Sequence, residues 1–159
     1  MLKTIFSCLI ALLLCAAAPR FDGPISGPAI ITDGDSIRIG RERIRFFGID
    51  APEMHQSCND DLGKRYACGE VSRDALRAHV DGAPITCNPV DRDRYGRTVA
   101  RCYANGEDLN AWMVANGWAV AYREFSRDYV QAEERAHAAR LGLWKGEFML
   151  PSLWRRREH

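Results

Sequence analysis

Three carboxylic acids that could share one site occur in the first third of the chain: Asp35, Asp50 and Glu53. Residues 36–39 alternate polar and apolar side chains as a half-buried strand does, Gly40-Arg41 favours a tight turn, and residues 42–49 form the returning strand. Such a hairpin brings both aspartates to one end of the sheet, with Glu53 just past Pro52. Carboxylates this close repel one another unless a cation lies between them, and a hard cation with oxygen ligands meets that need.

These acids also have a purely structural interpretation, because Asp33-Gly34-Asp35 is a common kind of turn and Asp50 would simply end a strand. Arg45 stands across the hairpin from Asp35, between Ile44 and Phe46, where an arginine normally carries its charged end to solvent. Its strand ends in acids, so it is instead expected to hold a phosphate against a bound cation. A guanidinium fork matches phosphate oxygens well.

A second cationic segment lies at residues 91–97, with the sequence Asp-Arg-Asp-Arg-Tyr-Gly-Arg. A solvated hairpin loop with neutralising ion pairs would have this composition. Arginine beside an aromatic ring is also the mixture that binds single-stranded nucleic acid, which would make this loop a phosphate-contacting arm with Tyr95 near a base or sugar. Tyr122 could stack in the same way, although a tyrosine there fits the core or its rim equally well.

The elements that must position these groups are mostly strands. Strands are predicted at 29–32, 36–39, 42–49, 83–87 and 98–103, and helices at 64–80, 109–115 and 128–140, with a loop at 88–97. Five strands and about three helices fit an α+β, mainly β class, and in particular a five-stranded Greek-key barrel of the OB-fold type. An open α+β sheet would give the same pattern.

The N-terminus has the composition of a secretory signal over residues 1–18. A basic start at Lys3 is followed by an apolar run at 5–14 and small residues at 16–18. We therefore expect an exported protein, with the periplasm, the external medium and a membrane anchor left open as its location. The alternative is a buried N-terminal helix.

The rest of the chain divides into three parts by composition. Residues 19–28, which contain two Gly-Pro steps, are expected to form a linker, and residues 29–146 the folded domain. Residues 147–159, with three consecutive arginines, are expected to be a mobile tail. No apolar run after the signal is long enough to cross a bilayer.

Four cysteines follow the signal: Cys58, Cys68, Cys87 and Cys102. An even number in an exported chain favours disulfides, and four cysteines allow three pairings. Cys58–Cys68 and Cys87–Cys102 are favoured because each joins segments that are close along the chain. A zinc site is the alternative, but its usual C-x2-4-C pairs do not occur.

Charge and motifs exclude several classes of protein. Without residues 1–18, basic and acidic residues number 21 each, so any attraction to phosphate must be local. The sequence has no G-x-S-x-G elbow, no P-loop and no H-E-x-x-H motif, and its histidines show no catalytic spacing. These absences exclude several hydrolase classes.

Four segments together resemble the staphylococcal nuclease (thermonuclease) family: residues 32–36, 45–53, 93–97 and 141–144. They occur in the family's order and span roughly residues 29–144. The resemblance implies an OB-fold barrel with one Ca²⁺ ion, and a calcium-dependent nuclease that hydrolyses DNA and RNA. Single strands would be favoured, sequence specificity would be low and the products would carry 3′-phosphates. It further implies a monomer with no obligate protein partner.

The resemblance also implies a role for each matching residue. Asp35 and Asp50 would bind the metal through their carboxylates, and Ala51, where the family often has threonine, through its backbone carbonyl. Glu53 would orient and deprotonate the attacking water. Arg45 and Arg97 would hold the scissile phosphate. The positions that would contact the nucleotide are Arg94, Tyr95 and Tyr122. The cysteines depart from the best-known member of the family, which has none.

Two other functions fit parts of the sequence. A non-enzymatic OB-fold module would bind single-stranded nucleic acid, but it has no need of three acids beside a phosphate site. A small disulfide-stapled domain of the cell envelope explains the cysteines but not the acids and arginines. The complete set therefore favours catalysis.

Overall fold

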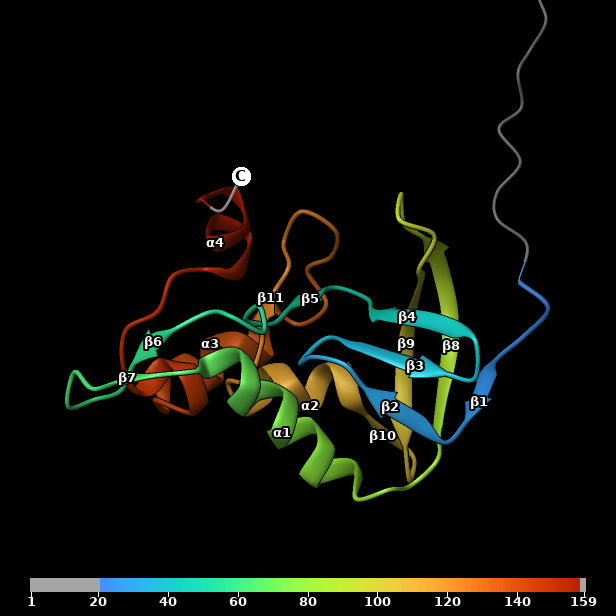
Figure 1. Ribbon diagram of the computed structural model, residues 1–159, viewed down its shortest axis with the longest axis horizontal. Coiled ribbons are helices and arrows are strands. Elements are labelled where there is room, and N and C mark those ends of the chain that lie inside the picture. The colour runs from blue at the N-terminus through green and yellow to red at the C-terminus, as the bar shows by residue number, and fades with distance from the viewer. Residues whose placement is uncertain (1–20, 158–159) are drawn as a thin grey trace, which may run out of the picture.

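The structure is a computed structural model that describes residues 21–157 (Figure 1). The predicted signal at residues 1–18 lies outside the described residues. The strands are β1 (Ile25–Gly27), β2 (Ala29–Ile31), β3 (Ser36–Ile39), β4 (Glu42–Phe46), β5 (Ile49–Asp50), β6 (Cys58–Asn59), β7 (Arg65–Tyr66), β8 (Ile85–Arg92), β9 (Thr98–Ala104), β10 (Glu107–Asp108) and β11 (Val120–Ala121). The helices are α1 (Cys68–Val80), α2 (Leu109–Ala115), α3 (Val130–Ala138), the 3-10 helix η1 (Gly142–Lys145) and α4 (Pro151–Arg157).

The main sheet has the strand order β1-β8-β9-β4-β3-β2, with β10 added on β9. Its pairs are antiparallel except for β4 and β9, which run parallel. Within residues 21–157 no ladder of hydrogen bonds joins β1 to β2, but only Pro28 separates them along the chain. The continuous segment from β1 to β2 therefore pairs with β8 through β1 and with β3 through β2. The predicted α+β, mainly β class is confirmed, and the topology is consistent with the OB type. In the part of the chain that the structure describes, the main sheet has seven strands rather than the predicted five and does not close into a barrel, and there are four α-helices rather than about three.

The hairpin of β3 and β4 has the register that the sequence predicts. Ser36 lies opposite Arg45, and the backbone N–H of Phe46 donates to the carbonyl of Asp35 over 2.7 Å. The preceding turn packs directly against α1, because a Cβ on Gly34 would overlap the hydroxyl of Ser72. A glycine is therefore required beside Asp35, and α1 fixes the place where this aspartate leaves the turn.

The strand predicted over 42–49 is broken in the structure, because β4 ends at Phe46 and Gly48 adopts a left-handed φ of 73°. The side chain of Asn110 stabilises this break. Its Nδ2 donates to the carbonyls of Phe47 (2.9 Å) and Ala100 (3.2 Å), and its Oδ1 accepts from a backbone N–H of β9. After the break, β5 leaves the main sheet and pairs with β11, which directs Asp50 toward the turn before β3.

The C-terminal half of the sheet differs from the prediction at residues 88–97, because β8 continues to Arg92 and the loop is only the turn after it. A register shift between Pro89 and Asp91 lets the pairing with β9 continue past the proline. Cys87 lies opposite Cys102 in this hairpin, and the two form a disulfide.

Both predicted disulfides are confirmed, and the second one, Cys58–Cys68, joins β6 to the first residue of α1. It belongs to a small apolar cluster with Leu143, Tyr66 and Phe148. The larger core lies against the main sheet and below α1, α2 and α3. Among residues 21–157, no helix is both long and apolar enough to cross a membrane.

Two of the predicted boundaries were wrong. The segment assigned to a linker at 19–28 contains β1, which pairs with β8 and so belongs to the sheet. The segment assigned to a mobile tail at 147–159 contains α4, and Glu147 forms a β-bridge with Asn59. Both segments are short, and their partners lie far away along the chain, so the local pattern does not reveal them.

Candidate active site

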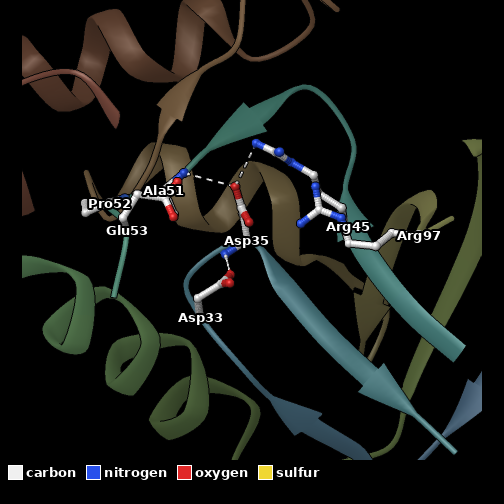
Figure 2. A pocket seen from close by; sticks show the side chains of 7 residues that line it. All are labelled: Asp33, Asp35, Arg45, Ala51, Pro52, Glu53 and Arg97. Carbon is white, nitrogen blue, oxygen red and sulfur yellow. Dashed lines mark hydrogen bonds and ion pairs between the residues drawn. The ribbon is translucent and has the colours of Figure 1, made fainter. Parts of the chain in front are cut away.

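A small pocket of about 40 Å³ lies where β3, β4, the segment after β5 and the residue before β9 meet (Figure 2). It is lined by Asp33, Asp35, Arg45, Ala51, Pro52, Glu53 and Arg97. Five of these seven residues were predicted to be functional from the sequence. Asp33 and Arg97, which are 64 residues apart along the chain, therefore line the same pocket.

Asp35 forms the centre of this pocket and is 6% exposed. Figure 2 shows its carboxylate between the Arg45 side chain and the backbone of Ala51. Arg45 Nη2 donates to Asp35 Oδ2 over 3.3 Å, the N–H of Ala51 donates to the same oxygen over 3.2 Å, and the hydroxyl of Ser36 donates to Oδ1 over 2.8 Å. The carboxylate is thus held in one orientation with its charge directed into the pocket.

Asp50 is more deeply buried, at 1% exposed, and two arginines contact it. Arg45 Nη2 lies 2.8 Å from Asp50 Oδ1, so this one nitrogen bridges Asp50 and Asp35. Arg155, from α4, donates from Nη1 to Oδ1 (2.9 Å) and from Nη2 to Oδ2 (3.0 Å). The same Nη1 contacts Glu53 Oε1 over 2.6 Å. Arginines therefore neutralise both aspartates of the site.

Arg155 is a site residue that the sequence did not indicate. It is the first of three consecutive arginines, and nothing in that run indicates that one of them contacts Asp50 and Glu53. Asp33 was assigned only a structural role, and it has that role, since its Oδ1 accepts from the N–H of Asp35 over 3.0 Å. It also lines the pocket, so the turn supplies two carboxylates rather than one.

The acids of the site differ in how firmly they hold a proton. Burial, together with the charge of Asp35, raises the pKa of Asp33 to about 7. Burial also raises the pKa of Asp50 to about 6, against the opposing effect of its arginines. For Asp35, burial is outweighed by Arg45 and by the hydrogen bonds it accepts, and its pKa stays below the usual value. Burial therefore disfavours the charged form of Asp33 and Asp50, whereas Arg45 and the hydrogen bonds favour the charged form of Asp35.

Glu53 is held by its backbone, while its side chain is 39% exposed. Its N–H donates to the side-chain oxygen of Gln56 over 3.2 Å. Gly69, in the first turn of α1, packs so closely that a Cβ there would overlap the carbonyl of Glu53. The main chain is thus fixed from two sides, and the carboxylate faces both the pocket and solvent water.

Arg97 is directed into the pocket by the turn between β8 and β9. Asp93 accepts from the backbone N–H of Arg97 over 2.9 Å and from its Nε over 2.7 Å. Figure 2 shows Arg97 approaching on the same side of Asp35 as Arg45. Two guanidinium groups therefore face the carboxylates across the pocket.

The predicted nucleotide-contacting residues lie near this pocket but do not line it. Tyr95, at the tip of the hairpin, is 62% exposed, and the guanidinium of Arg94 lies 5.2 Å from the centre of its ring. Tyr122 is half-buried, and the guanidinium of Arg45 lies 5.7 Å from its ring centre. One exposed and one half-buried aromatic ring therefore lie near the arginines of the site.

The residues present suit a hard cation. Residues 21–157 contain no cluster of three His, Cys, Asp or Glu side chains arranged to hold a metal, since Arg45 and Arg155 lie against the aspartates. The set predicted from the sequence needs only two carboxylates, Asp35 and Asp50, with the carbonyl of Ala51. All of these donors are oxygens, which Ca²⁺ and Mg²⁺ prefer. A pocket of about 40 Å³ has room for an ion and a water molecule.

The OB-type sheet thus brings two aspartates, a glutamate and two arginines into one pocket, a combination suited to chemistry on phosphate esters. The family described as staphylococcal nuclease homologue matches residues 43–146, and the chain belongs to this family. It is therefore a nuclease, a hydrolase whose substrates are nucleic acids.

The chain is also similar to proteins from bacteria and plants, some of which are named endonucleases or nucleases. The succinoglycan biosynthesis protein ExoI of Rhizobium meliloti is 38% identical over 148 residues, which cover 91% of this chain and 77% of that protein. An uncharacterized endonuclease of Haemophilus influenzae is 35% identical over 136 residues, covering 80% of this chain and 71% of that protein. A probable staphylococcal-like nuclease of rice, CAN2, is 32% identical over 135 residues, covering 82% of this chain and 34% of that protein.

Removal of the Cys87–Cys102 disulfide is expected to weaken both the fold and the activity. The pair closes a loop of 15 residues that contains the turn with Arg97, and such a loop is worth about 3 kcal/mol of unfolding free energy. We expect the double variant Cys87→Ala/Cys102→Ala to lose about this much in urea denaturation, and to cleave DNA more slowly because Arg97 is less firmly placed.

The matched control is Cys58→Ala/Cys68→Ala, which removes a disulfide of similar separation that does not hold the Arg97 turn. It should lower stability with a smaller effect on kcat under conditions where both variants are folded. Unchanged kcat and melting temperature for the Cys87/Cys102 variant would show that this disulfide does not anchor Arg97.

Proposed function

We propose that the chain is a calcium-dependent endonuclease that hydrolyses phosphodiester bonds of DNA and RNA with low sequence specificity. It prefers single strands and leaves 3′-phosphorylated products. The observation that supports this most is the pocket itself, in which Glu53 and the two arginines Arg45 and Arg97 lie around the carboxylate of Asp35. The enzyme acts as a monomer and needs no protein partner.

One Ca²⁺ ion would be held by the carboxylates of Asp35 and Asp50 and by the backbone carbonyl of Ala51. When bound, it would supply positive charge that stabilises the negative charge added to the phosphate during attack. The closeness of these groups supports this assignment, because one nitrogen of Arg45 contacts both carboxylates and Ala51 contacts Asp35.

Glu53 accepts the proton of the attacking water. Its partial exposure supports this role, since water can reach the carboxylate from solvent while the main chain stays fixed. Attack at phosphorus then breaks the bond to the 5′ oxygen, and the product keeps the phosphate on its 3′ oxygen. Arg45 and Arg97 hold the phosphate oxygens and stabilise the charge of the transition state.

The remaining nucleotide contacts come from Arg94, Tyr95 and Tyr122, which lie near the pocket without lining it. Arg94 binds a neighbouring phosphate, while Tyr95 and Tyr122 stack on bases or sugars. Stacking and phosphate contacts carry little sequence information, which accounts for the low specificity. Single strands are preferred because their bases are free to stack on the two rings.

Export is part of this proposal. It rests on the composition of residues 1–18 and is supported by the two disulfides, which form and persist mainly in oxidising compartments. The periplasm and the external medium both meet that condition.

Digestion of single-stranded DNA with Ca²⁺ or with a chelator tests the proposed function. We expect cleavage with Ca²⁺ and none with chelator. The products should carry a 3′-phosphate, so ligation or extension of their 3′ ends should succeed only after treatment with a phosphatase. Cleavage that is equal with and without chelator would exclude the metal mechanism. Binding of DNA without cleavage in any condition would identify a binding module instead.

A further inference from the structure

The C-terminal helix α4 reaches the active site although it is the last element of the chain. In Figure 1 it stands, after a long connection, on the side of the molecule where β5 and β11 lie. Arg155, in this helix, contacts Asp50 and Glu53, which precede it by 105 and 102 residues. No role in the reaction proposed above uses Arg155.

The connection before α4 is fastened next to the segment that follows Glu53. Asn59 and Glu147 exchange two backbone hydrogen bonds of 2.9 and 3.0 Å. Gln56, whose oxygen accepts from the N–H of Glu53, donates from Nε2 to the carbonyl of Met149 over 2.6 Å. Phe148 packs against the apolar cluster around the Cys58–Cys68 disulfide. These contacts fix where α4 begins, and this position brings Arg155 to the site.

Arg155 contacts one proposed ligand of the metal ion, Asp50, and the proposed base, Glu53. Its two terminal nitrogens bind both oxygens of Asp50, and one of them also binds Glu53. Arg45 adds a second contact to one Asp50 oxygen. A guanidinium is always charged in a protein, so Arg155 neutralises these acids at any working pH.

A guanidinium and a divalent cation cannot both occupy these oxygens without strong repulsion, because like charges a few ångströms apart in a partly buried site interact by several kcal/mol. We propose that α4 is an autoinhibitory latch in which Arg155 competes with the metal ion for Asp50 and pairs with Glu53. This inference rests on the proposed function, because it concerns the metal and the base of that same site. Metal binding releases the latch, and the closed latch lowers metal affinity by the same factor.

The helix is suited to reversible docking. It has seven residues, which is too short to be stable without packing against the domain. Pro151 is buried and Trp154 is half-buried, whereas Leu153 is exposed and the side chain of Arg155 keeps 29% of its surface accessible. Apolar packing therefore holds the start of α4, while the ion pairs of Arg155 hold its last turn against the site. A cation that takes over the carboxylates removes those ion pairs and weakens the attachment of that turn.

Calcium titration of the full chain by calorimetry tests the latch with three variants. Arg155→Gln removes the competing charge and is expected to tighten calcium binding about tenfold. This is the gain expected if the latch leaves the metal site open in about one tenth of the wild-type molecules. Arg155→Lys keeps the charge but loses the two-pronged contact, so about threefold is expected. Arg156→Gln is the control, because Arg156 contacts only Glu124, at 3.8 Å, and should change the affinity less than about twofold.

Hydrogen exchange of the wild-type protein is a second test of the latch, and it needs no variant. Amide exchange in residues 151–157 should become at least about tenfold faster when calcium is added, since the helix leaves the site. Exchange in α4 that is unchanged by calcium would overturn the latch. Calcium affinity in Arg155→Gln equal to or weaker than wild type would also overturn it.

The same samples separate this inference from the proposed function. If the wild type cleaves single-stranded DNA with Ca²⁺ while Arg155→Gln binds calcium no more tightly, the latch is wrong and the calcium-dependent nuclease stands. If Arg155→Gln binds calcium and the wild type does not, the latch is supported even where the wild type shows little cleavage. If neither binds calcium, both the metal assignment and the competition fail.

Discussion

Replacing Glu53 with glutamine is expected to lower kcat for cleavage of single-stranded DNA by about 10³-fold, which corresponds to about 4 kcal/mol of transition-state stabilisation. Glutamine has nearly the same shape but cannot take a proton from water. The main chain at this position is fixed by Gln56 and by the close approach of Gly69, so the substitution should leave the backbone in place. The loss would then reflect chemistry rather than misplacement.

Calcium binding should survive this change, because Glu53 is outside the proposed set of metal ligands. Glu70→Gln is the matched control, since Glu70 lies exposed on α1 and its removal should leave kcat unchanged. Steady-state kinetics with saturating calcium, together with a calcium titration, separate the base from the metal site. A kcat for Glu53→Gln within about threefold of wild type would contradict the assignment of Glu53 as the base.

Local patterns in the sequence predicted most of the fold that positions this site. The alternation at residues 36–39 and the Gly40-Arg41 turn are enough to predict the hairpin, because side chains in a strand alternate between faces and the turn fixes the register. The disulfides followed from short separations along the chain. Each of these patterns joins residues that are at most about 16 positions apart, so the chain allows few alternative partners.

The contacts that the sequence did not predict are those between distant segments. Arg155 pairs with an aspartate 105 residues earlier, and β1 pairs Ile25 with Cys87. A run of arginines or a three-residue strand is compatible with many partners, and only the folded domain selects among them. Asp33 shows a further limit, because one carboxylate can both cap a turn and line a pocket, and its sequence context reveals only the first role.

The arginines resolve a difficulty that the acids create. Asp35 and Asp50 are almost fully buried, and burying two carboxylates without partners would cost several kcal/mol. Arg45 contacts both of them and Arg155 contacts Asp50, so the fold does not depend on a metal ion for its stability. Because Arg45 and Arg155 are paired with these acids, attraction to phosphate must come from other local groups, such as Arg97, which pairs with Asp93 instead.

Arg97 is expected to contribute nearly as much to catalysis as Glu53. Its guanidinium is the one in the pocket that does not contact Asp35 or Asp50; it pairs instead with Asp93, across the turn. It is therefore positioned to receive the phosphate without first leaving a carboxylate of the site. We expect Arg97→Ala to lower kcat by about 10³-fold and Arg97→Lys by about 10²-fold, because lysine keeps the charge but not the fork that binds two oxygens.

Arg92→Ala is the matched control, since Arg92 precedes the same turn but contacts only the carbonyl of Gly96 and, at 4.0 Å, Glu42. It should change kcat less than about threefold. Single-turnover cleavage of a short single-stranded oligonucleotide at saturating calcium measures all three variants. The loss in Arg97→Ala should appear in kcat rather than KM, because the interaction strengthens as charge builds on the phosphate. A loss confined to KM would mean that Arg97 binds the substrate equally in its ground state, and the charge of the transition state would then have to be stabilised by Arg45 and the metal alone.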